Sequence, residues 1–338
     1  MKKRIKVLVV DDSIVFRETI IRGISTCPEI EVVARAADPF EARDKILEFE
    51  PDVMTCDVEM PKMNGIEFIR RLLPQYSIPV IVVSGVSESV FDAMNAGAVD
   101  FVAKPNDKSA NNMQIFIQDL IAKIIIASNS HIAKQSEHTS SKIAECIFPA
   151  DKIVAIGAST GGTEALFSVI SQLPANIPGV VVVQHIPPMF STLFSERLNT
   201  QTSLNVKEAQ TGDYLEQGRV LIAPGDQHMR IKKIGDRYKV EVFMGDKVNG
   251  HCPSVDVLFE SVAKEAGKNA VGVILTGMGY DGAKGLLGMR RKGARTIGQD
   301  EKSCVVYGMP KAAFDIGAVE KQVSLSNVPQ TIVNYLKT

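Results

Sequence analysis

Short runs of apolar, mostly β-branched residues recur along the first third of the chain. The first, at residues 5–10, has no alternation of polar and apolar positions, which is typical of a strand buried on both faces of a parallel sheet. Similar runs lie at 31–35, 52–57, 79–84 and 99–103, and the stretches between them, such as 40–49 and 66–73, carry apolar residues at helical spacing. The pattern predicts five strand–helix units that form a doubly wound, five-stranded parallel α/β domain over residues 1–127.

A second series of buried-type runs begins after residue 150. These runs lie at 152–157, 180–185, 219–223 and 271–277, with helical patterns such as 164–173 and 281–292 between them. The series predicts a second, mostly parallel α/β domain over residues 150–338. Within it, 229–232 and 238–243 flank a polar turn and predict an antiparallel hairpin.

The stretch between these two domains, residues 128–149, is rich in serine and charged residues. Such a segment buries too little apolar surface to offset the entropy that it loses on ordering, so we expect a linker. His131 and His138 lie in this stretch and are expected to be solvated.

Composition narrows the class of protein. A length of 338 residues suits two domains, and a formal net charge of -1 gives no basic surface for nucleic acid. The first apolar run is too short for the core of a signal peptide, and no run reaches the roughly eighteen residues of a membrane span. The five cysteines show no paired C-x-x-C spacing. We therefore expect a cytoplasmic protein with reduced thiols, Cys56 among them in a buried strand, without direct membrane insertion and without a nucleic-acid partner.

The first strand of the second domain stops at a glycine-rich segment. Gly157, Ser159 and Gly161 fit the spacing G-x-S-x-G, in which a sharp turn after a strand lifts a serine hydroxyl to the end of a sheet. Glycines between a strand and a helix also cradle phosphate groups, because backbone N–H groups at the helix start face the anion. A purely structural turn is the third interpretation, and the spacing alone does not choose among the three.

Polar side chains follow the predicted strands of the first domain. They are Asp11 and Asp12 after the first strand, Asp57 after the third, Ser84 after the fourth and Lys104 after the fifth. The carboxyl ends of parallel strands meet at one edge of a sheet, so these side chains are expected to converge. Neighbouring carboxylates repel one another unless a divalent cation such as Mg²⁺ binds among them, and that cation could also neutralise an arriving phosphoryl group. Taken singly, the aspartates could be helix N-caps and the lysine a solvated charge, but the complete set favours a phosphoryl site.

This set of residues resembles the response-regulator receiver domain, and the resemblance covers the whole first segment. The matching motifs are Asp11-Asp12, the block 57–65 with its proline and glycine, Ser84 and Lys104-Pro105. The resemblance implies that Asp57 accepts a phosphoryl group from a histidine kinase.

Further roles follow from the same resemblance. It implies that Asp11, Asp12, Asp57 and the backbone carbonyl of Glu59 serve Mg²⁺. It also implies that Ser84 and Lys104 report the phosphoryl state and that Phe101 is a switch aromatic, although core packing explains a phenylalanine at this position equally well.

In the second domain, the polar residues that follow predicted strands, and that should therefore meet at one edge of the sheet, are Ser159, His185 and Asp281. A serine hydroxyl becomes an effective nucleophile when an imidazole takes its proton, and a carboxylate holds that imidazole in the required tautomer. The order Ser, His, Asp along the chain differs from that of the α/β-hydrolases, so the G-x-S-x-G spacing does not imply that fold.

Competing interpretations stand beside each of these assignments. His185 could be a core histidine, and Asp281 could be a helix N-cap. His228 and His251, which lie in a turn and a loop, are rival bases and, more readily, contacts to a substrate.

Family resemblance chooses among these alternatives. Residues 150–338 resemble the catalytic domain of the chemotaxis protein-glutamate methylesterases (CheB), on the segments 157–162, 184–187, 223–228 and 276–282. The resemblance implies that Ser159 is the nucleophile, His185 the base and Asp281 the residue that orients it. It also implies that the backbone N–H of Met278 helps to hold the oxyanion, with Thr160 as a further oxyanion or supporting residue.

The two resemblances together imply a phosphorylation-activated esterase of bacterial chemotaxis adaptation. It would hydrolyse glutamate methyl esters on chemoreceptors without a cofactor, deamidate receptor glutamines by the same acyl chemistry, and receive its phosphoryl group from the chemotaxis histidine kinase. Without that group, the receiver is expected to cover the end of the sheet that carries Ser159. The alternative is a receiver-gated nucleotide- or phosphate-binding module, which the missing Gly-Lys-Ser/Thr ending opposes, and a DNA-binding output is opposed by the neutral charge.

Overall fold

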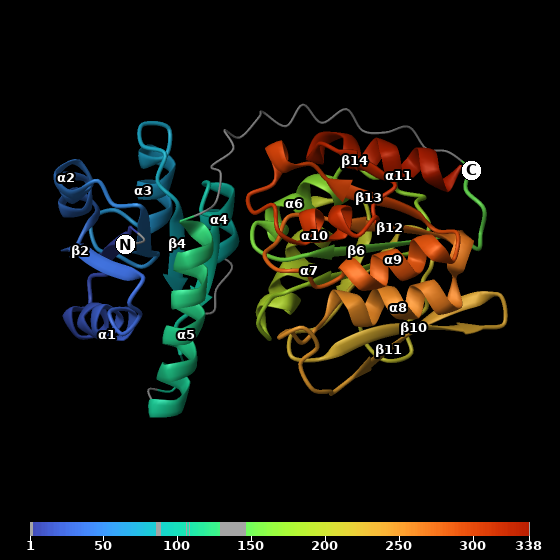
Figure 1. Cartoon of the computed structure of the whole chain (residues 1–338), viewed down its shortest axis with the longest axis horizontal. Coiled ribbons are helices and arrows are strands. Elements are labelled where there is room, and N and C mark those ends of the chain that lie inside the picture. The colour runs from blue at the N-terminus through green and yellow to red at the C-terminus, as the bar shows by residue number, and fades with distance from the viewer. Residues whose placement is uncertain (1–2, 86–88, 106, 108, 129–146, 338) are drawn as a thin grey trace. The chain divides into compact units, whose positions relative to one another are not determined.

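A computed structural model describes residues 3–85, 89–105, 107, 109–128 and 147–337 of the chain. The chain divides into two units, residues 1–135 and 136–338, and each unit is described by itself (Figure 1). The predicted linker at 128–149 falls mostly on residues 129–146, which lie outside the described residues, as do His131 and His138. The domain bounds at 127 and 150 therefore stay predictions.

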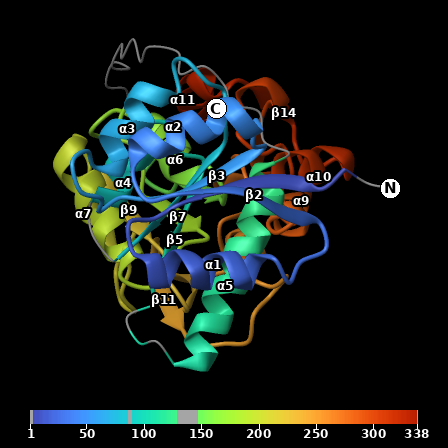
Figure 2. The same cartoon turned by 90° about the vertical axis from the view of Figure 1, so that its left-hand side faces the viewer.

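The first unit is a five-stranded, all-parallel sheet in the order β2-β1-β3-β4-β5. The strands are β1 (Ile5–Val10), β2 (Ile30–Ala36), β3 (Val53–Asp57), β4 (Val80–Ser84) and β5 (Asp100–Ala103). The helices are α1 (Ile14–Ile24), α2 (Pro39–Phe49), α3 (Gly65–Leu72), α4 (Ser89–Asn95) and α5 (Ala110–Ala127). Helices α1 and α5 pack together on one face, while α2, α3 and α4 cover the other (Figure 2). The predicted doubly wound domain is confirmed.

The residues before each helix explain where the helices of this unit begin. Ser13 precedes α1, and its hydroxyl accepts a hydrogen bond from the backbone N–H of Phe16. Asp38 and Asn64 cap α2 and α3 in the same way. Because Ser13 is the cap of α1, the aspartates before it are not, and their carboxylates lie at the end of the sheet.

The second unit is built on a seven-stranded parallel sheet in the order β14-β13-β12-β6-β7-β9-β8. Its strands are β6 (Ile153–Ala158), β7 (Val180–Gln184), β8 (Asn205–Glu208), β9 (Arg219–Ile222), β12 (Ala270–Ile274), β13 (Arg295–Gln299) and β14 (Lys321–Val323). A separate antiparallel hairpin joins β10 (His228–Ile234) to β11 (Arg237–Phe243). The predicted parallel sheet and the predicted hairpin are both confirmed.

Helices cover both faces of the second sheet. They are α6 (Gly162–Ile170), α7 (Phe190–Gln201), α8 (Val255–Glu265), α9 (Ala283–Arg291), α10 (Met309–Asp315) and α11 (Val328–Leu336), with short 3-10 turns η1 (Gly267–Asn269), η2 (Glu301–Ser303) and η3 (Leu325–Asn327). Helix α8 packs on the central strands with one side and on β10 with the other, so the hairpin forms an outer layer (Figure 1). No helix in the described part of the chain is long and apolar enough to cross a membrane.

Buried strands explain why the chemistry of both units is confined to the sheet ends. Every residue of β3, β4, β6, β7 and β12 is buried. A parallel sheet that is covered on both faces leaves room for reactive side chains only where its strands stop. The carboxyl ends of β6 and of its two neighbours, β7 and β12, are therefore the relevant edge of the second unit.

Candidate functional site

Ser159 and His185 lie side by side at this edge. Strands β6 and β7 pair in parallel with Ala158 opposite Gln184, and the backbone N–H of His185 donates to the carbonyl oxygen of Ala158 over 3.2 Å. The next residue on each strand is Ser159 on one side and His185 on the other. The sheet register thus brings these two predicted site residues together.

A buried glutamine ties the two backbones to one another. The side-chain amide of Gln184, which is 4% exposed, donates to the carbonyl oxygens of Ser159 (2.9 Å) and His185 (3.2 Å). A buried amide that bridges two carbonyls is difficult to displace, because both carbonyls would lose their partner. Gln184 therefore fixes the relative position of the two strand ends, and the sequence showed it only as part of a motif.

Asp281 contacts the imidazole of His185. Nε2 of His185 lies 2.9 Å from Oδ2 of Asp281, whose carboxylate is 1% exposed. Nδ1 of His185 is buried and has no hydrogen-bond partner among the described residues. A proton held on Nε2 by the carboxylate leaves the lone pair of Nδ1 available to accept a proton.

Several donors keep Asp281 ionised. Its oxygens accept hydrogen bonds from the side chains of Asn249 (2.8 Å) and Ser254 (2.8 Å) and from the backbone N–H of Val255 (2.7 Å). Burial by itself raises the pKa of Asp281, but the hydrogen bonds from His185 and Asn249, together with the charge of His185 and the Val255 N–H, hold that pKa well below its ordinary value. The carboxylate is negatively charged at neutral pH.

The helix that Asp281 caps is not the one that the sequence suggested. The N-cap position of α9 is Gly282, and Asp281 instead accepts the backbone N–H groups of Val255 and Asp256 in the first turn of α8. The positive end of that helix stabilises a carboxylate placed there. Asp281 therefore links α8 to the imidazole of His185.

Asn249 and Asp256 are site residues that sequence reasoning missed. The Asn249 amide nitrogen lies 2.8 Å from Oδ1 of Asp281 and 2.8 Å from Oδ2 of Asp256, so it bridges two buried carboxylates. Asp256 also accepts the backbone N–H of Gly285 over 2.7 Å, and burial raises its pKa. Asn249 adopts a left-handed φ of 53°. An Asn-Gly pair in a loop was the available signal, since such pairs favour that conformation.

The two rival histidines occupy different environments. His228 is buried, its Nε2 lies 2.9 Å from the carbonyl oxygen of Asp246, and its Nδ1 accepts the backbone N–H of Ser254 over 3.2 Å. Both of its ring nitrogens thus hold the loop 246–254 in place. His251 stacks on His185, with ring centroids 3.7 Å apart and planes 9° from parallel.

Gly277 brings a second backbone segment against Ser159. A Cβ on Gly277 would lie 2.7 Å from the Cβ of Ser159 and 2.4 Å from the sulfur of Met309, so only glycine fits here. The Ser159 N–H donates to the carbonyl oxygen of Thr276 over 3.0 Å. Among the described residues, the backbone N–H groups of Met278 and Thr160 have no acceptor in the protein. Two free N–H donors near Ser159 are suited to stabilise a developing oxyanion.

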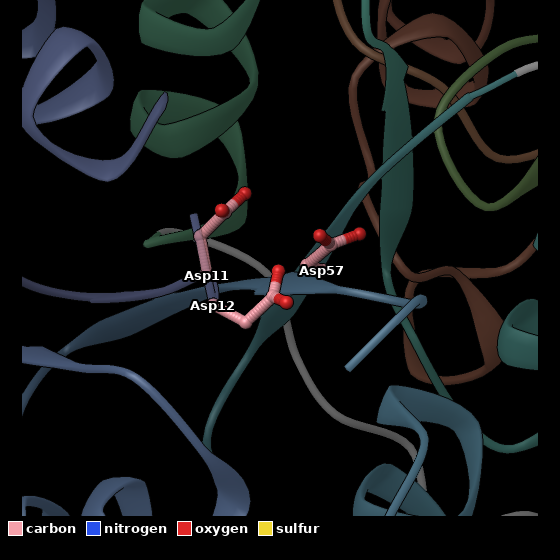
Figure 3. A group of neighbouring side chains, drawn as sticks. All are labelled: Asp11, Asp12 and Asp57. Atoms are coloured by element: carbon pink, nitrogen blue, oxygen red, sulfur yellow. The ribbon is translucent and has the colours of Figure 1, made fainter. Parts of the chain in front are cut away.

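In the first unit, three carboxylates gather at the ends of β1 and β3. Oxygens of Asp11, Asp12 and Asp57 lie within 4.8 Å of one another (Figure 3). The ammonium group of Lys104 lies 2.5 Å from Oδ2 of Asp57 and 3.0 Å from Oδ2 of Asp11. The backbone N–H of Glu59 donates to Oδ1 of Asp57 over 3.2 Å. The predicted convergence of these side chains is present in the folded chain.

This group of oxygens fits Mg²⁺. Magnesium prefers hard oxygen ligands and is held in proteins by one or two carboxylates together with waters. Asp11 is buried, and its Oδ2 lies 3.0 Å from the Lys104 ammonium. Burial raises the pKa of Asp11, the charge of Lys104 lowers it, and the charge of Asp57 raises it further. One ammonium group against three carboxylates leaves negative charge that a divalent cation would neutralise.

Ser84 is the last residue of β4, and Phe101 lies on the neighbouring strand β5. Ser84 is fully buried, and its hydroxyl has no partner among the described residues. Its carbonyl oxygen accepts the backbone N–H of Lys104 over 2.7 Å, which joins the two residues. Phe101 is buried against Phe91, with ring centroids 6.3 Å apart. Burial of this ring fits core packing and a switch role alike.

Comparison with known proteins gives concordant matches over both units. The family model "CheB methylesterase" matches residues 154–332, and the model "Response regulator receiver domain" matches residues 7–114. A protein-glutamate methylesterase/protein-glutamine glutaminase 2 of Syntrophomonas wolfei is 56% identical over 336 residues, which cover 99% of this chain and 98% of that protein. A protein-glutamate methylesterase/protein-glutamine glutaminase of Salmonella typhimurium is 45% identical over 98% of this chain and 96% of its own length.

A solved structure matches the second unit. The crystal structure of the Thermotoga maritima CheB methylesterase catalytic domain superimposes with a TM-score of 0.53 at 38% sequence identity. The match covers 54% of this chain and 97% of that domain.

Proposed function

Because the chain belongs to the CheB family of methylesterases that carry a response-regulator receiver domain, we propose that it acts as a protein-glutamate methylesterase and protein-glutamine glutaminase in chemotaxis. The substrates are chemoreceptors that bear glutamate methyl esters. The proposal for the site rests on the contact between Asp281 and Nε2 of His185. This contact leaves Nδ1, at the strand end beside Ser159, without a hydrogen-bond partner among the described residues.

The first half of the proposed reaction forms an acyl-enzyme. Oγ of Ser159 attacks the ester carbonyl carbon while Nδ1 of His185 takes the hydroxyl proton. The N–H groups of Met278 and Thr160 donate to the oxyanion of the tetrahedral intermediate. When the carbonyl re-forms, the C–O bond to the methoxy group breaks, and His185 returns its proton to that oxygen, so methanol leaves.

The second half of the reaction regenerates the enzyme. A water molecule gives a proton to His185 and attacks the acyl carbon, and the C–O bond to Ser159 then breaks as His185 returns the proton to Oγ. The product is a glutamate side chain. A glutamine substrate follows the same course with ammonia as the leaving group, which gives the same carboxylate.

The test of this mechanism is the release of methanol from methylated receptor membranes. Ser159→Ala is expected to keep the fold and to abolish methanol release. A matched control is Ser171→Ala, because Ser171 lies at the other end of the helix that follows Ser159. Methanol release by Ser159→Ala at the wild-type rate would refute the nucleophile.

For the receiver, we propose that Asp57 accepts a phosphoryl group from a chemotaxis histidine kinase and that this activates the esterase. When bound, Mg²⁺ would neutralise charge on the phosphoryl oxygens, and Asp11, Asp12 and Asp57, with the Glu59 carbonyl, would hold it. Lys104 and the hydroxyl of Ser84, which has no partner in the described part of the chain, would then contact the phosphoryl oxygens.

Activation is measured as the ratio of methanol release with and without a small phosphodonor. Asp57→Asn is expected to bring this ratio to one and to keep the basal rate. Asp44→Asn, an exposed aspartate on α2, is the control and is expected to keep the wild-type ratio. Full activation of Asp57→Asn would refute the assignment.

We also propose a cytoplasmic location. The four cysteines in the described part of the chain are free thiols, which suits a reducing compartment.

A further inference from the structure

His251 lies against the ring of His185 on the side of the loop 249–254. The two rings are 9° from parallel with centroids 3.7 Å apart, which is the geometry of a close stack. Among the residues that the structure describes, Asp281 is the one hydrogen-bond partner of the His185 ring, at Nε2. A single hydrogen bond fixes one atom of a ring but permits the ring to swing about that contact. The stack removes this freedom because a swing would drive one ring into the other.

We propose that His251 is a positioning residue of the esterase, which keeps the His185 ring in the plane that directs Nδ1 toward Ser159. This inference rests on the proposed function. It differs from both roles that the sequence suggested for His251, a rival base and a contact to substrate. A base would have to exchange a proton with Ser159, whereas a stacked ring acts through its face.

The charge state of His251 is consistent with this role. The charged and titratable groups that face it are His185, Asp281 and Lys247. Burial lowers the pKa of His251 to about 4, with the charges of His185 and Lys247 adding to the shift and that of Asp281 opposing it. His251 is therefore neutral at neutral pH. A neutral ring face accommodates the imidazolium that His185 becomes during turnover, whereas a second cation would oppose it.

The loop geometry makes His251 open to substitution. Its backbone N–H donates to the carbonyl oxygen of Val248 (2.9 Å), and its own carbonyl oxygen accepts the Val248 N–H (3.0 Å). These bonds do not involve the side chain. Replacing the side chain should therefore leave the loop, and with it the bond from Asn249 to Asp281, in place.

The experiment compares His251→Ala with His251→Phe in the full chain with a phosphodonor, on receptor membranes that carry radiolabelled methyl esters. Phenylalanine keeps a flat ring to stack on His185 but has no nitrogen. We expect His251→Ala to lower kcat by about 10- to 100-fold with KM within about twofold of wild type, because misplacement of a reacting group by about 1 Å can cost about 100-fold in rate. We expect His251→Phe to recover kcat to within about threefold of wild type.

A second readout separates positioning from general damage to the fold. The acid limb of the pH profile of kcat/KM is expected to keep its midpoint in His251→Phe and to move to higher pH in His251→Ala, because water that enters the vacated space solvates the imidazolium of His185. A pure loss of folded enzyme would lower the amplitude and leave the midpoint unchanged.

Two results would overturn the inference. If kcat falls equally in His251→Ala and His251→Phe, the imidazole nitrogens rather than the stacked ring are needed. If kcat of His251→Ala equals that of wild type, His251 has no positioning role. Ser159→Ala, measured in parallel, keeps the two proposals separate. If Ser159→Ala is inactive and His251→Ala is fully active, the positioning role alone is wrong; if Ser159→Ala is active, the proposed function is wrong.

Discussion

Asp281 holds His185 at Nε2 over 2.9 Å and at the same time accepts the backbone N–H of Val255 at the start of α8 over 2.7 Å. One carboxylate thus connects the imidazole to a buried helix end. Because that helix packs on the central strands, the orientation of His185 depends on the core of the unit as well as on a single contact.

Replacement of this carboxylate by an amide should abolish most activity. Asp281→Asn keeps the size of the side chain but removes the charge that favours the Nε2–H tautomer and the imidazolium, so we expect kcat to fall by about 10³- to 10⁴-fold. Methanol release under saturating receptor checks this. Asp315→Asn, at an exposed position on α10, is the control and should be near wild type. A loss of less than about tenfold in Asp281→Asn would contradict the role of Asp281.

Addition of one methyl group at Gly277 should displace the nucleophile. The new Cβ would lie 2.7 Å from the Cβ of Ser159, so Gly277→Ala is expected to lower kcat about 100-fold and stability by about 1–3 kcal/mol. Gly288→Ala in α9 is the matched control, because the nearest atom to its Cβ is 3.8 Å away and alanine favours a helix. Methanol release and urea midpoints measure the two effects. A Gly277→Ala enzyme with wild-type kcat would disprove the close approach.

Removal of the Lys104 ammonium should strengthen Mg²⁺ binding. The ammonium contacts the carboxylates of Asp11 and Asp57, which the metal would also use. We therefore expect Lys104→Met to bind Mg²⁺ several-fold more tightly and, without Mg²⁺, to be less stable by about 1–3 kcal/mol. Calorimetric titration with MgCl₂ measures the affinity, and Lys62→Met, at an exposed lysine of the same unit, is the control. Weaker Mg²⁺ binding in Lys104→Met would contradict a shared site.

Stability should depend on pH through His251. Its pKa is about 4 in the folded chain against an ordinary value of 6.5, so below about pH 6.5 the unfolded chain binds a proton that the folded chain does not. The free energy of unfolding therefore falls as the pH decreases from about 6.5 to about 4, by at most about 1.4 kcal/mol per pH unit. His251→Phe lacks this contribution. Urea unfolding of both proteins at about pH 7 and about pH 4.5 measures the free energy of unfolding, which should decrease more in wild type than in His251→Phe. Equal decreases in the two proteins would count against the prediction.

Much of the fold was accessible from the sequence because buried parallel strands have a clear signature. The uninterrupted runs at 5–10 and 180–185 lie on β1 and β7, and the polar turn between 229–232 and 238–243 joins β10 to β11. Strands β8, β13 and β14 were missed. The short β14, at Lys321–Val323, contains lysine and glutamine, and an edge strand of this composition lacks the apolar signature.

The candidate site was predictable only where its residues follow strands. Ser159 and His185 follow two paired strands, so the position of the carboxyl strand ends at one edge of the sheet predicts both. Asn249 comes from a loop, and Asp256 from the first turn of α8; their proximity to Asp281 depends on how α8 packs, which no local pattern contains. Glycines were open to a phosphate-binding interpretation, but a Cβ on Gly162 would lie 2.1 Å from Oε1 of Gln184, so close packing explains that glycine.

The position of β6 at the middle of the seven-stranded sheet has a consequence for partly opened states. Ser159 follows β6, and its neighbours β7 and β12 lead to His185 and Asp281, while the margins of the sheet are β8 and β14. Amide hydrogens of the three inner strands should exchange with solvent only through opening of the whole unit, whereas those of β8 and β14 should exchange through local fraying. The enzyme should therefore stay active at temperatures at which the edge strands β8 and β14 are already locally unfolded.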